Sequence, residues 1–345
     1  MSPGRTAIYA FTRKGATLGR RICEALRGDL FLPRRLAEDF DAIPFSAVAP
    51  LVQSRFGDYG AHVFIGATGI AVRTIGRLIR SKVTDPAVVV VDQEGRYVIS
   101  LLSGHLGGGN DLARRIAGIT GGEAVITTAT DQEGLPSIDV LALERGLSIG
   151  NTDGIKHVNA ALLEGGPIQV FDPEDRMGLR RGIPAIEVVE VVREGDWRPG
   201  IPGLWVTWKE KVPIAKQLVL HPRCLVVGLG CNRGTTAREI YRVIRELFGS
   251  EGLGLGSILC LSTIDLKRDE EGLLEAASSL GTEIRFFPAE ELDRVKVPNP
   301  SDMAKRYVGA RSVCEAAAIT GAGGGELIVP KRISGNVALA VAVAP

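Results

Sequence analysis

The sequence predicts an α/β protein made of several small domains, with parallel or mixed sheets and Gly-rich strand-to-helix loops. Three observations lead to this fold class. The chain has 345 residues, more than one domain usually holds. Apolar segments of strand length alternate with amphipathic segments of helix length. Glycine contributes 43 residues and aromatic side chains only 5%, so we expect a core of Val, Ile, Leu and Ala with many glycine turns.

The first predicted domain is an α/β domain over residues 1–148. Its expected elements are strands at 7–11, 61–65, 87–91, 97–102 and 124–127, a short apolar segment at 30–32, and helices at 18–26, 70–79 and 111–118. The strands at 87–91 and 97–102 read as a hairpin, because Gly95 can supply the positive φ of a tight turn.

Residues 149–220 are predicted to form a small middle domain or linker. A helix at 154–163 and a strand at 168–171 are followed by a stretch rich in Pro, Gly and charge, with strand-like patches at 186–192 and 203–207. This region holds all three tryptophans, Trp197, Trp205 and Trp208.

A C-terminal α/β domain is expected over residues 221–345. Its predicted strands are 225–227, 258–262, 284–288, 327–330 and 337–343, and its helices 237–247, 270–280, 289–295 and 313–320. Thr236 and Glu239 have the spacing of a capping box, which supports the helix start at Ala237.

Charge and cysteine usage exclude several classes of protein. The 41 Lys and Arg residues nearly balance 40 Asp and Glu, for a net charge of +1, so a basic nucleic-acid binder is not expected. We find no signal peptide and no apolar run near the roughly 18 to 20 residues of a membrane span, and therefore predict a cytoplasmic protein without membrane or nucleic-acid partners. The five scattered cysteines form no Cys-x-x-Cys pair, so neither a disulfide framework nor a protein metal site is predicted.

The segment SGHLGGGN, residues 103–110, is the most informative motif. Gly107 and Gly108 let the backbone approach a ligand, and Asn110 can cap the helix that follows, whose N–H groups favour an anion. Ser103 carries a hydroxyl, and His105 carries an imidazole, the side chain that most often transfers protons in enzymes. The alternative is a tight strand–helix turn with a surface histidine.

A second glycine loop contains Gly66, Thr68 and Gly69 and leads a helix that bears Arg73 and Arg77. Arginine forks bind carboxylates with two parallel hydrogen bonds. The alternative is an ordinary solvated basic helix face.

A third loop contains Gly228, Gly230, Cys231, Arg233 and Gly234 and also precedes a helix. Its alternative is again a glycine-rich turn. The three loops lack both the Walker and the dinucleotide fingerprints, and the chain has no G-x-S-x-G elbow. These absences weaken the hypothesis of a nucleotide-dependent enzyme.

Ser312 and Glu315 begin an alanine-rich segment that also holds Cys314. Glu315 is a candidate ligand-facing carboxylate, and helix solubility is the alternative. Asp131 and Asp139 flank a Gly-Leu-Pro turn, where turn and cap chemistry is the expected role.

Together, five segments resemble the CbiG family of anaerobic cobalamin biosynthesis, the cobalt-precorrin-5A hydrolases. They are GATGIAVR (66–73), DPAVVVVDQEGRYVISLLSGHLGGGNDLARRIA (85–117), AVITTATD (124–131), VVGLGCNRGT (226–235) and SVCEAAAITGAGGGELIVPK (312–331). The resemblance spans nearly the whole chain in the expected order. Gly109 and Cys314 stand where the family usually has Ala, and the middle region carries no motif that matches.

The resemblance implies a hydrolase that opens the δ-lactone of cobalt-precorrin-5A with water, giving cobalt-precorrin-5B and acetaldehyde. The substrate is a corrinoid ring with many carboxylate arms. Its cobalt is part of the substrate, and no cofactor is expected. A lactone carbonyl needs a base and an oxyanion donor. We therefore expect His105 as base or polarising donor, Ser103 to orient water, backbone N–H groups of Gly107 and Gly108 at the oxyanion, and Glu315 as a reserve acid or base.

Substrate contacts are predicted at the glycine loops and at the start of the alanine-rich helix. The candidates are Gly66, Thr68, Gly69, Arg73, Gly107, Gly108, Asn110, Gly228, Gly230, Cys231, Arg233, Gly234 and Ser312. We expect the loops to gather at the carboxyl ends of the strands. The alternative function is a corrinoid-binding or channelling protein without chemistry of its own, and other enzymes of the pathway are candidate partners.

Overall fold

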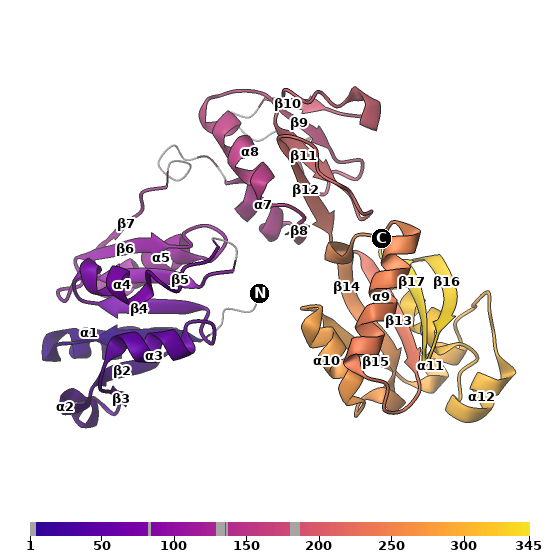
Figure 1. Cartoon of the computed structure of the whole chain (residues 1–345), viewed down its shortest axis with the longest axis horizontal. Helices are drawn as coiled ribbons and strands as arrows, with labels where there is room; N and C mark the ends of the chain where they lie inside the picture. The colour runs from indigo at the N-terminus through magenta and orange to yellow at the C-terminus, as the bar shows by residue number, and fades with distance from the viewer. Residues whose placement is uncertain (1–4, 82–83, 129–134, 136, 180–186) are drawn as a thin grey trace. The chain divides into compact units, whose positions relative to one another are not determined.

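The computed structural model describes residues 5–81, 84–128, 135, 137–179 and 187–345. The chain divides into two compact units, Met1–Val140 and Leu141–Pro345 (Figure 1). The N-terminal unit holds one seven-stranded sheet, and the second unit holds two five-stranded sheets. Mixed sheets with flanking helices confirm the predicted α/β class. The three-domain boundaries at residues 148 and 220 stay a prediction.

The sheet of the N-terminal unit has the order β3-β2-β1-β4-β5-β6-β7. Its strands are β1 (Thr6–Ala10), β2 (Asp29–Pro33), β3 (Ile43–Phe45), β4 (Ala61–Ile65), β5 (Ala87–Val91), β6 (Tyr97–Leu102) and β7 (Glu123–Val125). Strands β1 to β5 are parallel, β6 pairs antiparallel with β5, and β7 runs parallel to β6. Strands β1, β4 and β5 are buried along their whole length, which explains their continuous apolar sequences.

Helices cover both faces of this sheet. They are α1 (Arg13–Leu26), α2 (Arg34–Ala37), the 3₁₀ helix η1 (Glu38–Phe40), α3 (Val48–Arg55), α4 (Thr68–Ile75) and α5 (Gly109–Thr120). One core joins α1, α2 and α5 to one face, and a second core joins α3 and α4 to the other. The chain steps outward from β1 to β3, returns to β4 beside β1, and continues to β5 on the other side. The carboxyl ends of the neighbouring strands β1 and β4 therefore form a topological switch point, the place where open α/β sheets bind ligands.

An aromatic cluster under α3 encloses His62 of β4, which is fully buried. The Tyr9 hydroxyl and His62 Nδ1 are 3.0 Å apart, and Nε2 is 3.1 Å from the Phe56 carbonyl oxygen. A neutral ring satisfies both contacts if Nε2 donates and Nδ1 accepts. Burial lowers the pKa of His62 to about 4 and raises the pKa of Tyr9. This histidine is a core residue that stays neutral.

The first sheet of the second unit has the order β10-β9-β11-β12-β8. Its elements are α7 (Ile138–Glu144), β8 (Leu147–Ile149), α8 (Asp153–Leu163), β9 (Ile168–Phe171), β10 (Val188–Glu190), η2 (Glu194–Asp196), β11 (Gly203–Val206) and β12 (Gln217–Pro222). Trp197 and Trp205 are buried in its core, where Trp205 stacks on Phe171 with ring centroids 4.0 Å apart. The stretch expected to be loosely patterned thus contains a packed sheet.

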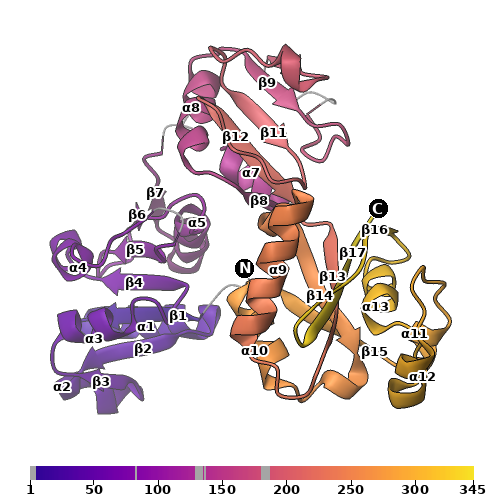
Figure 2. The same ribbon diagram turned by 45° about the vertical axis from the view of Figure 1, so that its right-hand side comes forward.

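The second sheet of this unit has the order β15-β14-β13-β17-β16. Its elements are β13 (Leu225–Cys231), α9 (Ala237–Glu251), η3 (Leu255–Ser257), β14 (Ile258–Ile264), η4 (Asp265–Lys267), α10 (Glu271–Ser279), β15 (Glu283–Phe287), α11 (Ala289–Asp293), α12 (Asp302–Val308), α13 (Val313–Gly321), β16 (Glu326–Ser334) and β17 (Val337–Val343). Helices α9 and α10 cover one face and α13 the other (Figure 2). The Ser148 hydroxyl donates to the Gly256 carbonyl at 2.8 Å, which joins β8 to the segment before β14.

In the described part of the chain, no helix is both long and apolar enough to cross a membrane. The cytoplasmic location stays a prediction.

Candidate functional site

The switch point of the N-terminal sheet carries the predicted loop with Gly66, Thr68 and Gly69. The Gly66 N–H donates to the Val91 carbonyl at 2.8 Å, so the loop continues from the carboxyl end of β4 beside β5. The Arg73 guanidinium folds back along α4 toward Gly69. A β-carbon at residue 69 would stand 3.4 Å from the terminal nitrogens of Arg73. Across the residues that the structure describes, Arg73 has no acidic partner. Arg73 is thus an exposed residue of the last turn of α4, and its unpaired guanidinium extends back toward Gly69, at the helix start beside the switch point.

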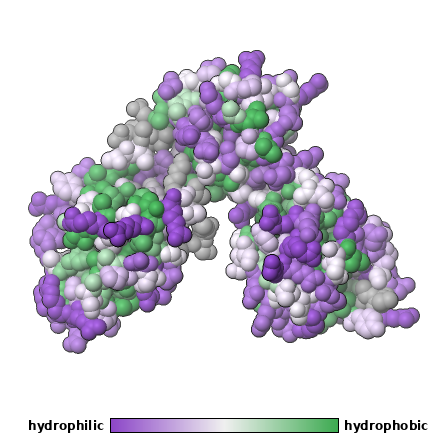
Figure 3. All heavy atoms as spheres, in the orientation of Figure 1, coloured by the Kyte–Doolittle hydropathy of each residue, from purple (hydrophilic) through white to green (hydrophobic). Residues whose placement is uncertain are grey.

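The surface next to this loop is mixed in polarity. On the face of the N-terminal unit that Figure 3 shows, hydrophilic side chains lie next to and across a hydrophobic area. Helix α4 and the residues after it expose Val72 and Ile79 beside Arg73 and Arg77. Such a surface suits a ligand that combines an apolar body with carboxylate groups.

Two residues at the switch point were missed by sequence reasoning. Thr12 follows β1 and caps α1, since its hydroxyl oxygen accepts from the Gly15 N–H at 3.1 Å. The same hydroxyl donates to Gln93 Oε1 at 3.3 Å, which connects the β1 and β5 loops. Only the strand order, which is invisible in the sequence, brings residues 12, 68 and 93 to one edge.

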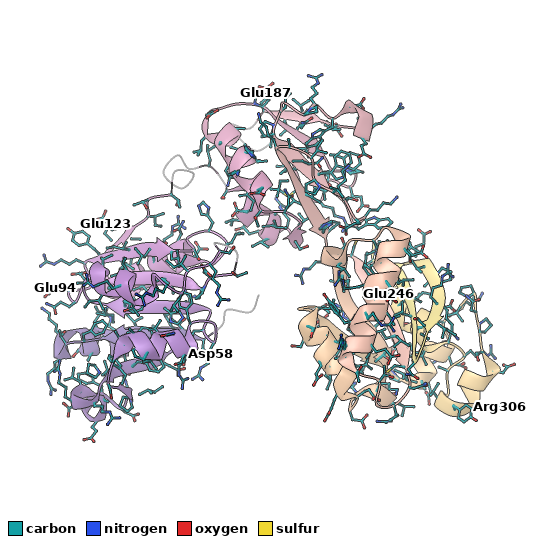
Figure 4. All side chains as sticks on the ribbon, in the orientation of Figure 1. Asp58, Glu94, Glu123, Glu187, Glu246 and Arg306 are labelled. Carbon is teal, nitrogen blue, oxygen red and sulfur yellow. The ribbon has the colours of Figure 1, made fainter. Side chains whose placement is uncertain are left out.

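The loop at residues 103–109 lies at the opposite edge of the sheet, which corrects the expectation that all glycine loops gather at strand carboxyl ends. Strand β6 runs antiparallel to β5, and its last residue, Leu102, pairs with Val88 near the start of β5. Figure 4 marks the two edges: Glu94 lies in the turn after β5, and Asp58 lies before β4 at the other end. At about 3.3 Å per residue, the two loops are separated by roughly 15 Å of sheet.

The loop at 103–109 caps its own helix. The Gly109 N–H donates to the Ser103 carbonyl at 3.0 Å, the Asn110 N–H to the Gly104 carbonyl at 2.9 Å, and the Gly108 N–H to the His105 carbonyl at 2.9 Å. The start of α5 is therefore less open to an anion than expected. The Gly108 N–H is also engaged, so it is not free to be the predicted oxyanion donor. The corresponding role of Gly107 stays a prediction.

Ser103 has two unusual properties. Its φ is +54°, in the left-handed region that non-glycine residues rarely adopt. Its hydroxyl oxygen is buried and has no hydrogen-bond partner in the described structure. Backbone strain and unsatisfied buried polar atoms each cost free energy and concentrate at functional sites. Both properties single out Ser103 within the loop.

Asn110 and His105 complete the loop. Asn110 is 4% exposed and donates through Nδ2 to the Thr128 hydroxyl at 3.1 Å. A side chain at Gly104 would come within 2.6 Å of Asn110 Oδ1, so this amide packs against the loop and holds its shape. His105 is half-buried between Gly104 and the glycines. The loop thus gathers Ser103, His105 and Asn110, as the sequence predicted.

The third loop lies at the carboxyl edge of the C-terminal sheet, but Gly228 serves a packing role. A β-carbon at residue 228 would stand 1.8 Å from the Cys314 carbonyl oxygen, so α13 lies directly on β13 there. This corrects the prediction that Gly228 contacts substrate. Gly230 and Cys231 are half-buried at the end of β13. Burial raises the pKa of the Cys231 thiol, which disfavours a reactive thiolate.

Arg233 already has partners within the chain. Its guanidinium donates to Asp269 Oδ2 at 2.8 Å and to the Leu266 carbonyl at 3.2 Å. The Gly234 N–H donates to Glu270, whose carboxylate also receives Lys267 at 3.0 Å. These donors lower the pKa of Glu270. A substrate carboxylate would therefore compete with Asp269 for Arg233, in contrast to the unpaired Arg73.

Glu315 is fully buried and receives four hydrogen bonds. The donors are Asn299 Nδ2 at 2.7 Å, the Lys331 N–H at 2.9 Å, the Asn299 N–H at 3.1 Å and the Ser312 hydroxyl at 3.2 Å. Burial alone would raise the pKa of Glu315, but these donors together lower it. This geometry favours a structural carboxylate that ties α13 to β16 and to the chain at residue 299. The acid or base role of Glu315 stays a prediction.

Asp131 and Asp139 are the two further carboxylates for which turn and cap chemistry was predicted. Asp139 lies in the first turn of α7, is 2% exposed and accepts from the Ser137 hydroxyl. The cap role of Asp139 stays a prediction. Asp131 lies outside the described residues.

Fold and loops together define a multi-sheet α/β protein with glycine-rich loops and an unpaired arginine at a switch point, a class suited to anionic small molecules. Three sequence families match consecutive parts of the chain: "Cobalamin synthesis G N-terminal" at residues 50–131, "Cobalamin biosynthesis central region" at 136–222 and "Cobalamin synthesis G C-terminus" at 225–342. The chain belongs to the cobalamin synthesis G (CbiG) family.

Two relatives are similar along nearly their whole length. The chain is 33% identical over 357 residues to a protein of Priestia megaterium named cobalt-precorrin-5A hydrolase, covering 99% of this chain and 96% of the relative. It is 32% identical over 338 residues to a protein of the same name from Salmonella typhimurium, covering 92% of each. Protein CobE of a Sinorhizobium species is 32% identical over 121 residues, 34% of this chain and 79% of CobE.

Proposed function

We propose that this chain is a hydrolase of cobalamin biosynthesis that acts on cobalt-precorrin-5A. Its support is the similarity to two hydrolases of that name over almost the full length of each chain. In the proposed reaction, water adds to the acyl carbon of the δ-lactone and the acyl–oxygen bond breaks. The hydroxyl of the released alcohol then loses its proton and becomes the carbonyl of acetaldehyde as the adjacent carbon–carbon bond breaks. The electron pair of that bond stays on the ring carbon, which takes up a proton. The cobalt belongs to the substrate, and the proposal includes no cofactor.

The observation that carries the site assignment is the strained Ser103 with its unpartnered hydroxyl. We propose that this hydroxyl orients the attacking water and that His105, two residues on in the same loop, takes the proton from it. The Gly107 N–H is the proposed donor to the developing oxyanion. Asn110 holds the loop in the required shape through Thr128 and Gly104.

Arg73 has a separate role in this proposal. It lies at the carboxyl edge of the sheet, whereas Ser103 and His105 lie at the amino edge. Arg73 therefore does not touch the lactone that reacts at Ser103. We propose that it binds a carboxylate group at the switch point, because it is exposed and unpaired in the described structure.

The proposed activity is tested by an anaerobic assay of the full chain on cobalt-precorrin-5A, which follows acetaldehyde and the mass of the ring. Acetaldehyde with the mass of the opened ring supports the hydrolase. Substrate binding without acetaldehyde would instead support a corrinoid-binding or channelling protein, the second candidate.

A further inference from the structure

Two adjoining pockets lie along helix α8, beside the first sheet of the second unit. One has a volume of about 580 Å³ and is lined by α8 and by residues 213–217. The other has a volume of about 360 Å³ and is lined by α8 and by residues 200–202. His157 and Lys216 line both pockets and therefore mark the point where they join. Each volume lies within the range of small-molecule sites.

Lys216 is held in a conformation that costs free energy. Its φ is +61°, in the left-handed region that residues with a β-carbon rarely adopt. Its ammonium donates to the Gly200 carbonyl at 3.1 Å, so the side chain lies between the two pocket walls. One contact leaves two of the three ammonium donors for other acceptors. Residues kept in strained conformations concentrate at ligand sites.

Gln217, the next residue, has a side-chain amide with an unsatisfied donor. Gln217 is 1% exposed, and its Oε1 accepts from the Ile214 N–H at 3.2 Å. Its Nε2 is buried without a hydrogen-bond partner in the described structure. Gln169 of the same sheet provides the contrast, because its Nε2 donates to the Arg198 and Ile201 carbonyls, each at 2.6 Å. A buried amide in this sheet can thus be satisfied, and the one that lines the pocket is not.

The remaining lining is apolar on one side and weakly charged on the other. Pro167, Ile201, Pro202 and Ile214 supply apolar surface. Two acidic residues also line the pockets: Asp153, which is 3.7 Å from Lys156, and Glu164, an exposed residue at the C-cap of α8. Lys216 and His157 lie where the two pockets join. We propose that these pockets bind a small molecule that carries a carboxylate on an apolar body. Lys216 and His157 contact the carboxylate, and Gln217 donates from the wall.

The test uses 3-phenylpropionate as the probe and 3-phenylpropionamide as its uncharged match. The full chain is labelled at histidine and followed by NMR, with the His157 signals assigned by H157Q. The chain has four histidines, so the other three report on non-specific effects. We expect phenylpropionate to shift the His157 signals saturably, with a Kd in the millimolar range, and the amide to leave them in place.

Two variants test whether the Lys216 ammonium contributes to phenylpropionate binding. Lys216→Gly removes the ammonium and the backbone strain, and Lys216→Met keeps the stem and the strain. Both are expected to weaken phenylpropionate binding about tenfold, the order of a lost charge-assisted hydrogen bond. The matched control is Arg27→Gly, which removes an exposed cation at φ +54° in the N-terminal unit and should leave binding unchanged.

Three outcomes would overturn the proposal. They are equal binding of acid and amide, full affinity in both Lys216 variants, and no saturable shift at His157. The proposal is independent of the hydrolase function, since binding of the probe is measured without turnover.

Discussion

Gly107 and Ser103 pack so closely that a β-carbon at residue 107 would stand 2.4 Å from Cβ of Ser103 and 2.8 Å from its carbonyl oxygen. Real β-carbons do not approach other atoms this closely. The loop conformation that strains Ser103 therefore depends on the missing side chain at Gly107. This relationship links the glycines of the motif to a particular serine.

Gly107→Ala should displace Ser103 and lower kcat for acetaldehyde release at least tenfold, because small misplacements of a reacting group cost about that much or more. Gly118→Ala in α5, the helix that follows this loop, is the matched control. Nothing lies within 4 Å of a β-carbon there, so this change should stabilise α5 by up to about 1 kcal/mol and keep full activity. Equal kcat values for the two variants, measured in the anaerobic assay, would contradict the role of the loop.

Ser103→Gly should make the protein more stable and less active. Glycine tolerates φ +54° and removes an unsatisfied buried hydroxyl, so the free energy of unfolding should rise by about 1 kcal/mol. If the hydroxyl orients water, kcat should fall at least tenfold. Thermal unfolding and turnover are measured on the same preparation. A stabilised variant with unchanged kcat would assign Ser103 no part in the reaction.

Acid should destabilise the N-terminal unit through His62. The pKa of His62 is about 4 in the folded state against 6.5 for the free side chain. Between these values the unfolded chain binds the extra proton, so stability is complete above pH 6.5 and falls as pH drops toward 4. The loss is about 2 kcal/mol at pH 5 and about 3 kcal/mol at pH 4.

His62→Gln should remove this part of the pH dependence, because an amide can still accept from Tyr9 and donate to the Phe56 carbonyl without titrating. Urea unfolding of the wild-type and variant chains at pH 7 and pH 5 measures the difference. Gly118→Ala, which changes no titratable group and whose β-carbon meets no atom within 4 Å, is the control and should leave the slope unchanged. An identical slope in H62Q and wild type would show that His62 is not the titrating group.

Glu315→Gln separates a structural carboxylate from a catalytic one. An amide can accept only through its one oxygen and turns an NH₂ group toward donors, so we expect a loss of about 2 to 4 kcal/mol in the stability of the second unit. Activity per folded molecule should be kept. The measurement pairs urea unfolding with kcat at a temperature where the variant is folded. A stable but inactive E315Q would restore Glu315 as an acid or base.

Local signals in the sequence predicted local structure well. The hairpin around Gly95, whose φ is +73°, and the helix start at Thr236, whose hydroxyl accepts from the Glu239 N–H at 3.3 Å, both follow from neighbouring residues. Helix α3 was missed because its residues Val48–Arg55 show little amphipathic periodicity. The strand β12 (Gln217–Pro222) was also missed, since it follows a stretch dominated by Pro, Gly and charge.

The site was predictable only in part, because long-range pairing decides what each residue can do. The loop at 103–110 was found from its glycines, yet its position at the amino edge depends on how β6 pairs with β5. The partner of Arg233 could not be predicted from neighbouring residues, because Asp269 lies 36 residues away in sequence. Glu315 likewise meets donors from residues 299 and 331, each 16 residues away in sequence, which no local spacing reveals.

In the proposed function, the loop that carries Ser103 and His105 performs the hydrolysis of cobalt-precorrin-5A. We compare acetaldehyde release by wild type and His105→Ala under anaerobic conditions, with Arg27→Gly, at an exposed position outside the loop, as a control. We expect acetaldehyde and an opened ring from wild type and R27G, and a loss of at least a hundredfold in kcat for H105A, the usual scale of a lost general base. Near-normal turnover by a folded H105A chain would contradict it.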